Sequence, residues 1–94
     1  MKIMTTSCTD NITGFMVLAT DCSYNFAMDW LARELDKYDV EILSCVTDKV
    51  TGYTKIKTGQ YSHILGDFKP CDDYYYDEER GYLLRDLKIM NYPS

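Results

Sequence analysis

The stretch Cys71–Leu87, CDDYYYDEERGYLLRDL, is the most biased part of this chain and decides the fold that we expect. Asp72 or Asp73 is a candidate N-cap for a helix, because a side-chain oxygen can accept a hydrogen bond from a free amide in the first turn. Acidic residues follow at once, which suits the positive end of a helix dipole. One face of this helix would carry apolar side chains at helical spacing, namely those of Tyr76, Leu83, Leu87 and Met90.

Gly81 leaves a second interpretation of the same stretch open. Glycine in the middle of a helix costs about 1 kcal/mol relative to alanine, so a break at this position is reasonable. The helix would then begin only at Gly81, and residues 71–80 would form an acidic loop. In both interpretations the helix stops near residues 91–94, which include a proline and form a fraying tail.

Composition indicates one folded domain spanning residues 1–94. The chain has 94 residues, of which 46% are hydrophobic and 27% charged, as in ordinary globular proteins. Fifteen acidic residues outnumber ten basic ones, and the net charge is −5. Binding to a phosphate backbone needs a surplus of lysine and arginine, so direct nucleic-acid binding is not expected.

The four cysteines predict neither a metal site nor a secreted disulfide scaffold. Cys8, Cys22, Cys45 and Cys71 are 14, 23 and 26 residues apart, and zinc ligands usually come in close pairs. The sequence shows no secretory signal and no apolar run long enough to span a bilayer. We therefore expect reduced, mostly buried cysteines in a cytoplasmic protein, in the host cytoplasm if the protein is viral, without membrane contact.

The first half of the chain predicts a strand followed by a helix. Residues 12–20 hold a short apolar run of strand length, and residues 1–4 are candidates for a short edge strand. Asp21 or Ser23 is a candidate N-cap for a helix that ends near Lys37. The predicted apolar face of this helix consists of Tyr24, Ala27, Met28, Leu31, Leu35 and Tyr38.

A β-hairpin is expected next. Residues 38–46 and 53–58 alternate and are rich in β-branched and aromatic side chains, and a turn that ends in Gly52 joins them. Gly59 is expected to close the hairpin. Residues 60–68 fit either a fourth strand or a short helix, and the strand is the preferred interpretation.

These elements predict an α+β fold with a small, three- or four-stranded, mainly antiparallel sheet and two helices packed on one face. The first strand, the first helix and the second strand are suited to a right-handed crossover. The sequence contains neither an internal repeat nor a long linker.

Catalytic and metal-binding patterns find little support. His63 is the single histidine, and its neighbour Ser62 would lie on the opposite face of a strand. Common hydrolase, P-loop, dinucleotide and zincin motifs do not occur, and the acidic residues after Cys71 do not follow the EF-hand order. We expect no catalytic residues, no metal and no cofactor. The alternative is a small enzyme or ligand-binding domain built on His63, Tyr61 and a cysteine.

The acidic tyrosine-rich stretch favours contact with a protein partner, most simply a basic one. Tyrosine gives a large contact area at low entropic cost, and carboxylates complement a groove rich in arginine and lysine. Small acidic inhibitors, many of them phage-encoded DNA mimics, occupy the grooves of nucleic-acid-handling proteins in this way. The comparison rests on charge and size. The predicted partner-binding residues in this stretch are Asp72, Asp73, Tyr74, Tyr75, Asp77, Glu78 and Glu79.

Phe26 and Trp30 are a second candidate contact, one turn apart at the border of the first helix's apolar face. Tryptophan is enriched in the energetic centres of protein interfaces. The same pair would serve self-association into a homodimer, which is the third hypothesis for this chain. The simpler alternative is that both rings widen the buried face against a sheet.

Overall fold

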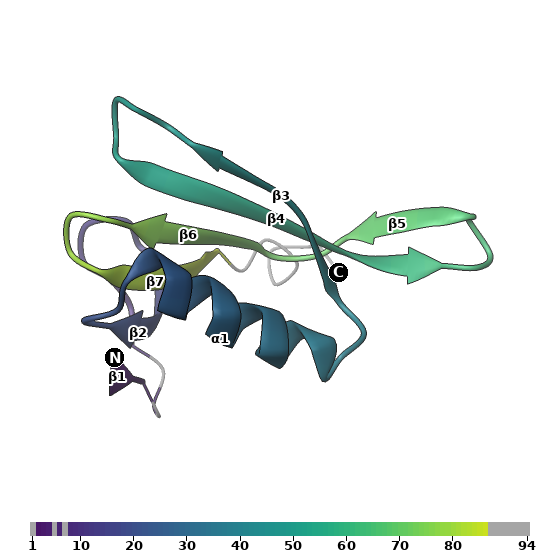
Figure 1. The fold of residues 1–94 in the computed structure, drawn as a ribbon, viewed down its shortest axis with the longest axis horizontal. Coiled ribbons are helices and arrows are strands. Elements are labelled where there is room, and N and C mark those ends of the chain that lie inside the picture. The colour runs from purple at the N-terminus through teal and green to yellow at the C-terminus, as the bar shows by residue number, and fades with distance from the viewer. Residues whose placement is uncertain (1, 5, 7, 87–94) are drawn as a thin grey trace.

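One helix and a seven-stranded antiparallel sheet form the fold in the computed structural model, which describes residues 2–4, 6 and 8–86 (Figure 1). The chain runs through β1 (Lys2–Ile3), β2 (Met16–Thr20), α1 (Tyr24–Asp36), β3 (Glu41–Thr47), β4 (Tyr53–Ser62), β5 (Asp67–Pro70), β6 (Asp73–Asp77) and β7 (Tyr82–Asp86). This part of the chain is therefore mostly β. The expected small sheet with two helices on one face is wrong, since more strands and a single helix are present.

The strands follow the order β1-β2-β7-β6-β4-β3, and every neighbouring pair is antiparallel. The long strand β4 pairs with β3 along one side. On its other side, β4 pairs first with β6 and then with β5. Thr58 stabilises the point on β4 where pairing passes from β6 to β5. Its carbonyl oxygen accepts a hydrogen bond from the Cys71 amide at 2.9 Å, and its hydroxyl donates one to the Asp72 carbonyl at 2.7 Å.

The stretch that predicted a C-terminal helix forms the β6–β7 hairpin in the middle of the sheet. Tyr74 and Tyr76 are buried on the helix side, and Tyr75 faces the other side, which is the two-residue alternation of a strand. Both the predicted helix start at Asp72 or Asp73 and the predicted acidic loop are wrong. Consecutive tyrosines favour a pleated surface, and this preference prevails over the weaker helical spacing.

The acidic residues of this stretch build the hairpin turn instead of a first helical turn. Asp77 Oδ1 accepts from the amides of Glu79 and Arg80 at 3.1 and 3.3 Å, as aspartates often do in turns. Gly81 closes the turn with a φ of 68°, a conformation that other residues rarely adopt. The expected helical positions Leu87 and Met90, and the expected stop at 91–94, lie outside the described residues.

The first half of the chain confirms the predicted strand and helix, although Tyr24 and Tyr38 of the predicted apolar face are exposed and Tyr38 lies beyond the helix. Ser23 caps α1 by accepting from the Phe26 amide, and Ala27, Leu31 and Leu35 are buried against the sheet. The helix leads from β2 to β3, which run parallel to each other with β7, β6 and β4 between them (Figure 1). In the described part of the chain, no helix is both long enough and apolar enough to cross a membrane.

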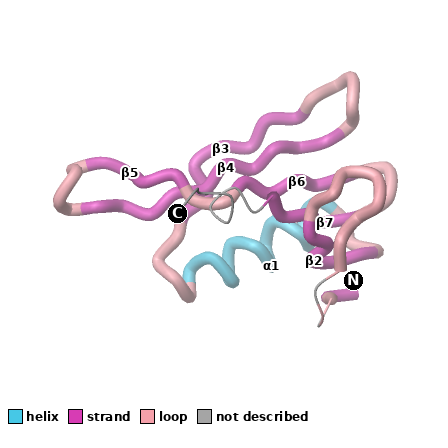
Figure 2. Tube along the Cα trace, turned by 180° about the vertical axis from the view of Figure 1, so that it is seen from behind, coloured by secondary structure: helices cyan, strands magenta, loops and turns pink. Residues whose placement is uncertain are grey.

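The predicted hairpin of the second and third strands is also confirmed as β3–β4, but Gly59 does not close it. Gly59 lies inside β4, between Glu41 of β3 and Pro70 of β5. Residues 60–68 therefore contain the end of β4, a turn and the start of β5. Figure 2 shows the β4–β5 hairpin extending beyond the end of the helix.

The cysteine predictions are confirmed only in part. All four thiols are free, but Cys22 alone among them is buried. Cys8 and Cys45 are exposed, and Cys71 is partly buried. The expectation of mostly buried cysteines was wrong because it treated each thiol as a small apolar side chain without knowing which strands lie at the edge.

Arg80 ties the β6–β7 turn to the N-terminal segment. Its guanidinium donates to both carboxylate oxygens of Asp10 at 2.9 and 3.0 Å and to Asp77 Oδ2 at 2.6 Å. Both carboxylates are buried. These hydrogen bonds hold the pKa of Asp10 far below its ordinary value and raise that of Arg80.

Replacing Gly59 by valine should destabilise the fold, although valine favours strands. A Cβ atom at position 59 would lie 2.7 Å from Leu43 Cδ1 and 3.0 Å from the Lys69 carbonyl oxygen, which is held by the β4–β5 pairing. We expect the free energy of unfolding in urea to fall by about 1–3 kcal/mol. Lys57→Val, at an exposed site on the same strand, is the control. Equal stability of the two variants would contradict the steric argument.

Asp10→Asn should lower the free energy of unfolding at pH 7 by roughly 1.5–3 kcal/mol, because a charged partner of Arg80 is lost. The folded pKa of Asp10 lies below its ordinary value of 3.8, so protons bind the unfolded chain more readily. The stabilisation is therefore present above pH 4 and is lost as the pH falls. Urea unfolding measured between pH 7 and pH 2 should show that the difference in free energy of unfolding between wild type and variant becomes smaller as the pH falls. A constant gap would refute this account.

Candidate functional site

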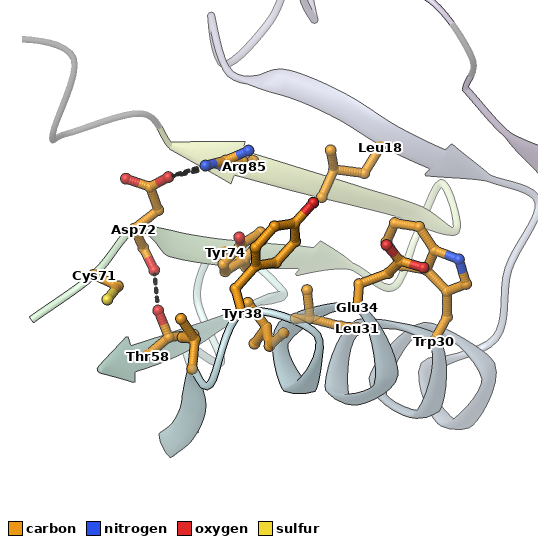
Figure 3. Close-up of a pocket in the computed structure, with 12 residues that line it drawn as sticks. Leu18, Trp30, Leu31, Glu34, Tyr38, Thr58, Cys71, Asp72, Tyr74 and Arg85 are labelled. Atoms are coloured by element: carbon orange, nitrogen blue, oxygen red, sulfur yellow. Dashed lines mark hydrogen bonds and ion pairs between the residues drawn. The ribbon is translucent and has the colours of Figure 1, made fainter. Parts of the chain in front are cut away.

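A groove of about 520 Å³ lies between α1 and the sheet (Figure 3). Its apolar floor comes from the core, and its polar groups come from four separate parts of the chain. The lining residues are Leu18, Trp30, Leu31, Glu34, Leu35, Tyr38, Val40, Thr58, Cys71, Asp72, Tyr74 and Arg85. We refer to this site as the acidic–aromatic groove.

The helix side of the groove is a row of three side chains one turn apart. Trp30, Glu34 and Tyr38 follow each other at four-residue spacing, so they lie on one edge of α1 and just beyond its end. Glu34 is partly exposed and lies between the two aromatic residues of the row (Figure 3). Its carboxylate contacts the exposed Lys37 ammonium at 3.0 Å, an interaction that contributes little at a surface.

The sheet side is built by the strands that the β6–β7 hairpin brings under the helix. Arg85 of β7 pairs in register with Tyr74 of β6, and both side chains face the helix side. The Arg85 guanidinium carbon lies 5.8 Å from the centre of the Tyr74 ring. Leu18 of β2 completes this wall next to Arg85 (Figure 3).

Asp72 is the most deeply buried charged group of the groove, with 5% of its surface exposed. Arg85 donates to its Oδ2 atom from Nε at 2.8 Å and also from a terminal nitrogen. The Oδ1 atom is buried and has no hydrogen-bond partner among the described residues. A buried carboxylate oxygen without a donor is unusual, since burial of an uncompensated charge is costly.

Among the residues that line the groove, acidic side chains outnumber basic ones, and the Lys37 ammonium that contacts Glu34 lies outside the lining. Glu34 and Asp72 provide two carboxylates, whereas Arg85 provides one guanidinium among the lining residues. Burial raises the pKa values of the Tyr74 phenol and the Cys71 thiol, so both stay neutral at pH 7. A neutral thiol is a poor nucleophile, and the groove is better suited to binding a cation than to covalent chemistry.

Three of the residues predicted to bind a partner meet in this groove. Trp30 comes from one predicted surface, and Asp72 and Tyr74 come from the other. The sequence did not predict that these three side chains lie in one site. The helical interpretation of residues 71–80 placed the acidic stretch on a separate element, whereas the sheet places Asp72 and Tyr74 of this stretch opposite α1.

The remaining residues of the acidic stretch lie elsewhere. Asp77 is buried and paired with Arg80. Asp73 is also buried, and one of its carboxylate oxygens is 3.7 Å from the Lys55 ammonium. Tyr75 stacks on Phe15 on the other face of the sheet, at 5.0 Å between ring centres.

The exposed candidates lie away from the groove. Glu78 and Glu79 are exposed in the β6–β7 turn. Phe26 is 65% exposed near the start of α1 and does not line the groove, unlike Trp30 one turn later.

Sequence reasoning missed Glu34, Tyr38 and Arg85 as members of one site. The four-residue spacing of Trp30, Glu34 and Tyr38 is a signal that could have identified the helix side of the groove. Arg85 gave no such signal, because its neighbours are determined by strand pairing over a distance in the chain.

The alternative site around His63 is an open depression lined by Asp36, Asp39, Val40, Glu41, Gln60, Tyr61 and His63. The rings of Tyr61 and His63 touch edge to face, with 5.1 Å between their centres. Its lining residues include no cysteine, so the suggested trio of His63, Tyr61 and a cysteine is not brought together there. Among the described residues, no cluster of three or more potential metal ligands occurs.

Comparison of this chain with protein-family models, with curated proteins and with solved structures found no match.

The pair Asp72 and Arg85 should be energetically coupled. Arg85→Met leaves a buried carboxylate without its donor, whereas Asp72→Asn with Arg85→Met removes both charges. A double-mutant cycle of urea unfolding should give a coupling free energy of about 1–3 kcal/mol. Additive effects of the two substitutions would show that the pair contributes nothing beyond its separate members.

Proposed function

We propose that this chain is a non-enzymatic protein-interaction module whose acidic–aromatic groove binds a lysine or arginine side chain of a basic partner segment. The observation that carries this proposal is the composition of the groove. In the part of the chain that the structure describes, two carboxylates, three aromatic side chains and one guanidinium line it, and one oxygen of Asp72 has no donor.

The helix row favours a cation over a neutral ligand. Trp30 and Tyr38 lie one turn before and one turn after Glu34, so an incoming ammonium or guanidinium would approach a carboxylate and two aromatic residues. A cation close to an aromatic face gains about 0.5–2 kcal/mol, and more as water is excluded. The aliphatic stem of lysine or arginine matches the apolar floor formed by Leu31, Leu35 and Val40.

The charge of the whole chain supports the same partner class. With a net charge of −5, the protein attracts basic surfaces over distances of about 10 Å at moderate salt. Proteins that handle nucleic acids carry such surfaces. An inhibitor that covers the basic groove of such a protein is the specific form of this proposal, and the exposed Glu78 and Glu79 would add charge at its edge.

Titration with a hexalysine peptide, followed by NMR of labelled protein, tests the groove directly. Asp72→Asn and Glu34→Gln should each weaken binding at least about fivefold, which corresponds to roughly 1 kcal/mol. Asp29→Asn changes the net charge equally, on an exposed part of α1 outside the groove, and should have a much smaller effect. Affinity should fall as salt is raised.

The same titration separates the groove from the hairpin turn. If the combined Glu78→Gln and Glu79→Gln substitutions weaken binding more than Asp72→Asn does, the contact lies at the turn and the groove proposal fails. An equal loss of affinity in all variants, including Asp29→Asn, would mean that net charge alone attracts the peptide. Absence of any binding to the peptide would also contradict the proposal.

A further inference from the structure

The described part of the chain ends next to the acidic–aromatic groove. Its last strand, β7, reaches Asp86, which pairs in register with Asp73 of β6, and Arg85 just before it lines the groove. Because the two strands are antiparallel, the end of β7 lies at the same end of the sheet as Asp72, which precedes β6. The segment that follows β7 therefore starts beside the most deeply buried carboxylate of the groove.

This segment, residues 87–94, lies outside the described residues and has the sequence LKIMNYPS, whose chemistry complements that of the groove. Lys88 is its single charged side chain, and it is basic. The groove offers the carboxylates of Glu34 and Asp72. The segment also carries four large apolar or aromatic side chains, which suit the apolar floor: Leu87, Ile89, Met90 and Tyr92.

The short connection keeps Lys88 near Asp72. Lys88 follows Arg85 by three residues, and Arg85 itself donates hydrogen bonds to Asp72. An extended chain spans at most about 3.3–3.6 Å per residue, so the Cα atoms of Lys88 and Arg85 lie within roughly 11 Å of each other. A group on so short a tether has an effective concentration on the order of millimolar at its site. Even an intrinsically weak contact with the groove is therefore populated.

We propose that residues 87–94 occupy the acidic–aromatic groove as an internal competitor of the basic partner. The Lys88 ammonium donates to the Oδ1 atom of Asp72, which has no donor among the described residues. The apolar side chains of the segment cover the floor of the groove. This inference rests on the proposed function, since Lys88 takes the place of the lysine or arginine that the partner supplies.

Occupation by this segment regulates which partners bind. The apparent dissociation constant for a partner equals the intrinsic constant divided by the fraction of open grooves. A partner with one basic side chain replaces only the contact that Lys88 already makes. A segment with several basic side chains also gains contacts with the exposed Glu78 and Glu79, so the groove selects for such segments.

Trp30 reports occupation of the groove without any partner, because it is the only tryptophan of the chain and lines the groove. Tyr38 lies one helical turn or more along the same row and provides a second ring (Figure 3). NMR of the full chain should show nuclear Overhauser contacts between these rings and the methyl groups of residues 87–94.

A matched pair of lysine variants tests the role of the charge. Lys88→Glu places a third carboxylate beside Asp72 and Glu34 and should release the segment, so that acrylamide quenches Trp30 at least about twofold more strongly. Lys49→Glu makes the same change at an exposed site in the β3–β4 turn and should leave the quenching unchanged. Circular dichroism checks that both variants fold.

Titration with hexalysine then measures the competition. Lys88→Gln and Lys49→Gln each remove one positive charge, so general electrostatic attraction changes equally in both. Lys88→Gln should bind the peptide at least about threefold more tightly than Lys49→Gln, because the fraction of open grooves rises.

Equal affinity of Lys88→Gln and Lys49→Gln for hexalysine would overturn the competition. Absence of the ring contacts, together with equal quenching of Trp30 in Lys88→Glu and Lys49→Glu, would overturn the occupation itself. Failure of hexalysine to bind any of these proteins would contradict the proposed function. The ring contacts and the quenching would still decide whether residues 87–94 occupy the groove.

Discussion

The guanidinium of Arg80, held between Asp10 and Asp77, is the interaction on which the rest of the structure depends. It joins the N-terminal segment to the β6–β7 turn, 70 residues apart in the chain. The same turn positions the start of the helix, because the Gly81 carbonyl accepts from the Cys22 amide at 3.1 Å. Tyr76 adds a hydrogen bond from its hydroxyl to the Cys22 carbonyl at 2.7 Å. One turn therefore holds both the segment around Asp10 and the start of α1 in place.

The position of this turn also creates the acidic–aromatic groove. With β6 and β7 in the middle of the sheet, Tyr74 and Arg85 lie beneath α1, and Asp72 lies just before β6. The helix contributes Trp30, whose spacing from Glu34 is independent of the sheet. The groove thus combines a side determined by local helical geometry with a side determined by long-range pairing. The surplus of carboxylates among its lining residues is the basis of the proposed preference for a basic partner.

The acidic stretch illustrates why composition alone is a weak guide to a surface. Asp10, Asp73 and Asp77 are each buried within reach of a basic side chain, so these acidic residues stabilise the fold. Glu78 and Glu79 keep the solvent-exposed role that the sequence suggested for the whole stretch. A carboxylate beside an arginine in three dimensions cannot be distinguished from a solvated one by charge counts along the chain.

The sequence by itself determined the local elements: the helix capped by Ser23, the apolar strand before it and the β3–β4 hairpin. Their periodicities arise from neighbouring residues. It also identified Trp30, Asp72 and Tyr74, but as parts of two unrelated surfaces. Only the tertiary structure decided that residues 73–86 form a central hairpin, because pairing with β4 and β2 satisfies backbone groups that no local pattern reveals. Because of that pairing, most of the aspartates of the acidic stretch are buried beside basic side chains, next to the acidic–aromatic groove.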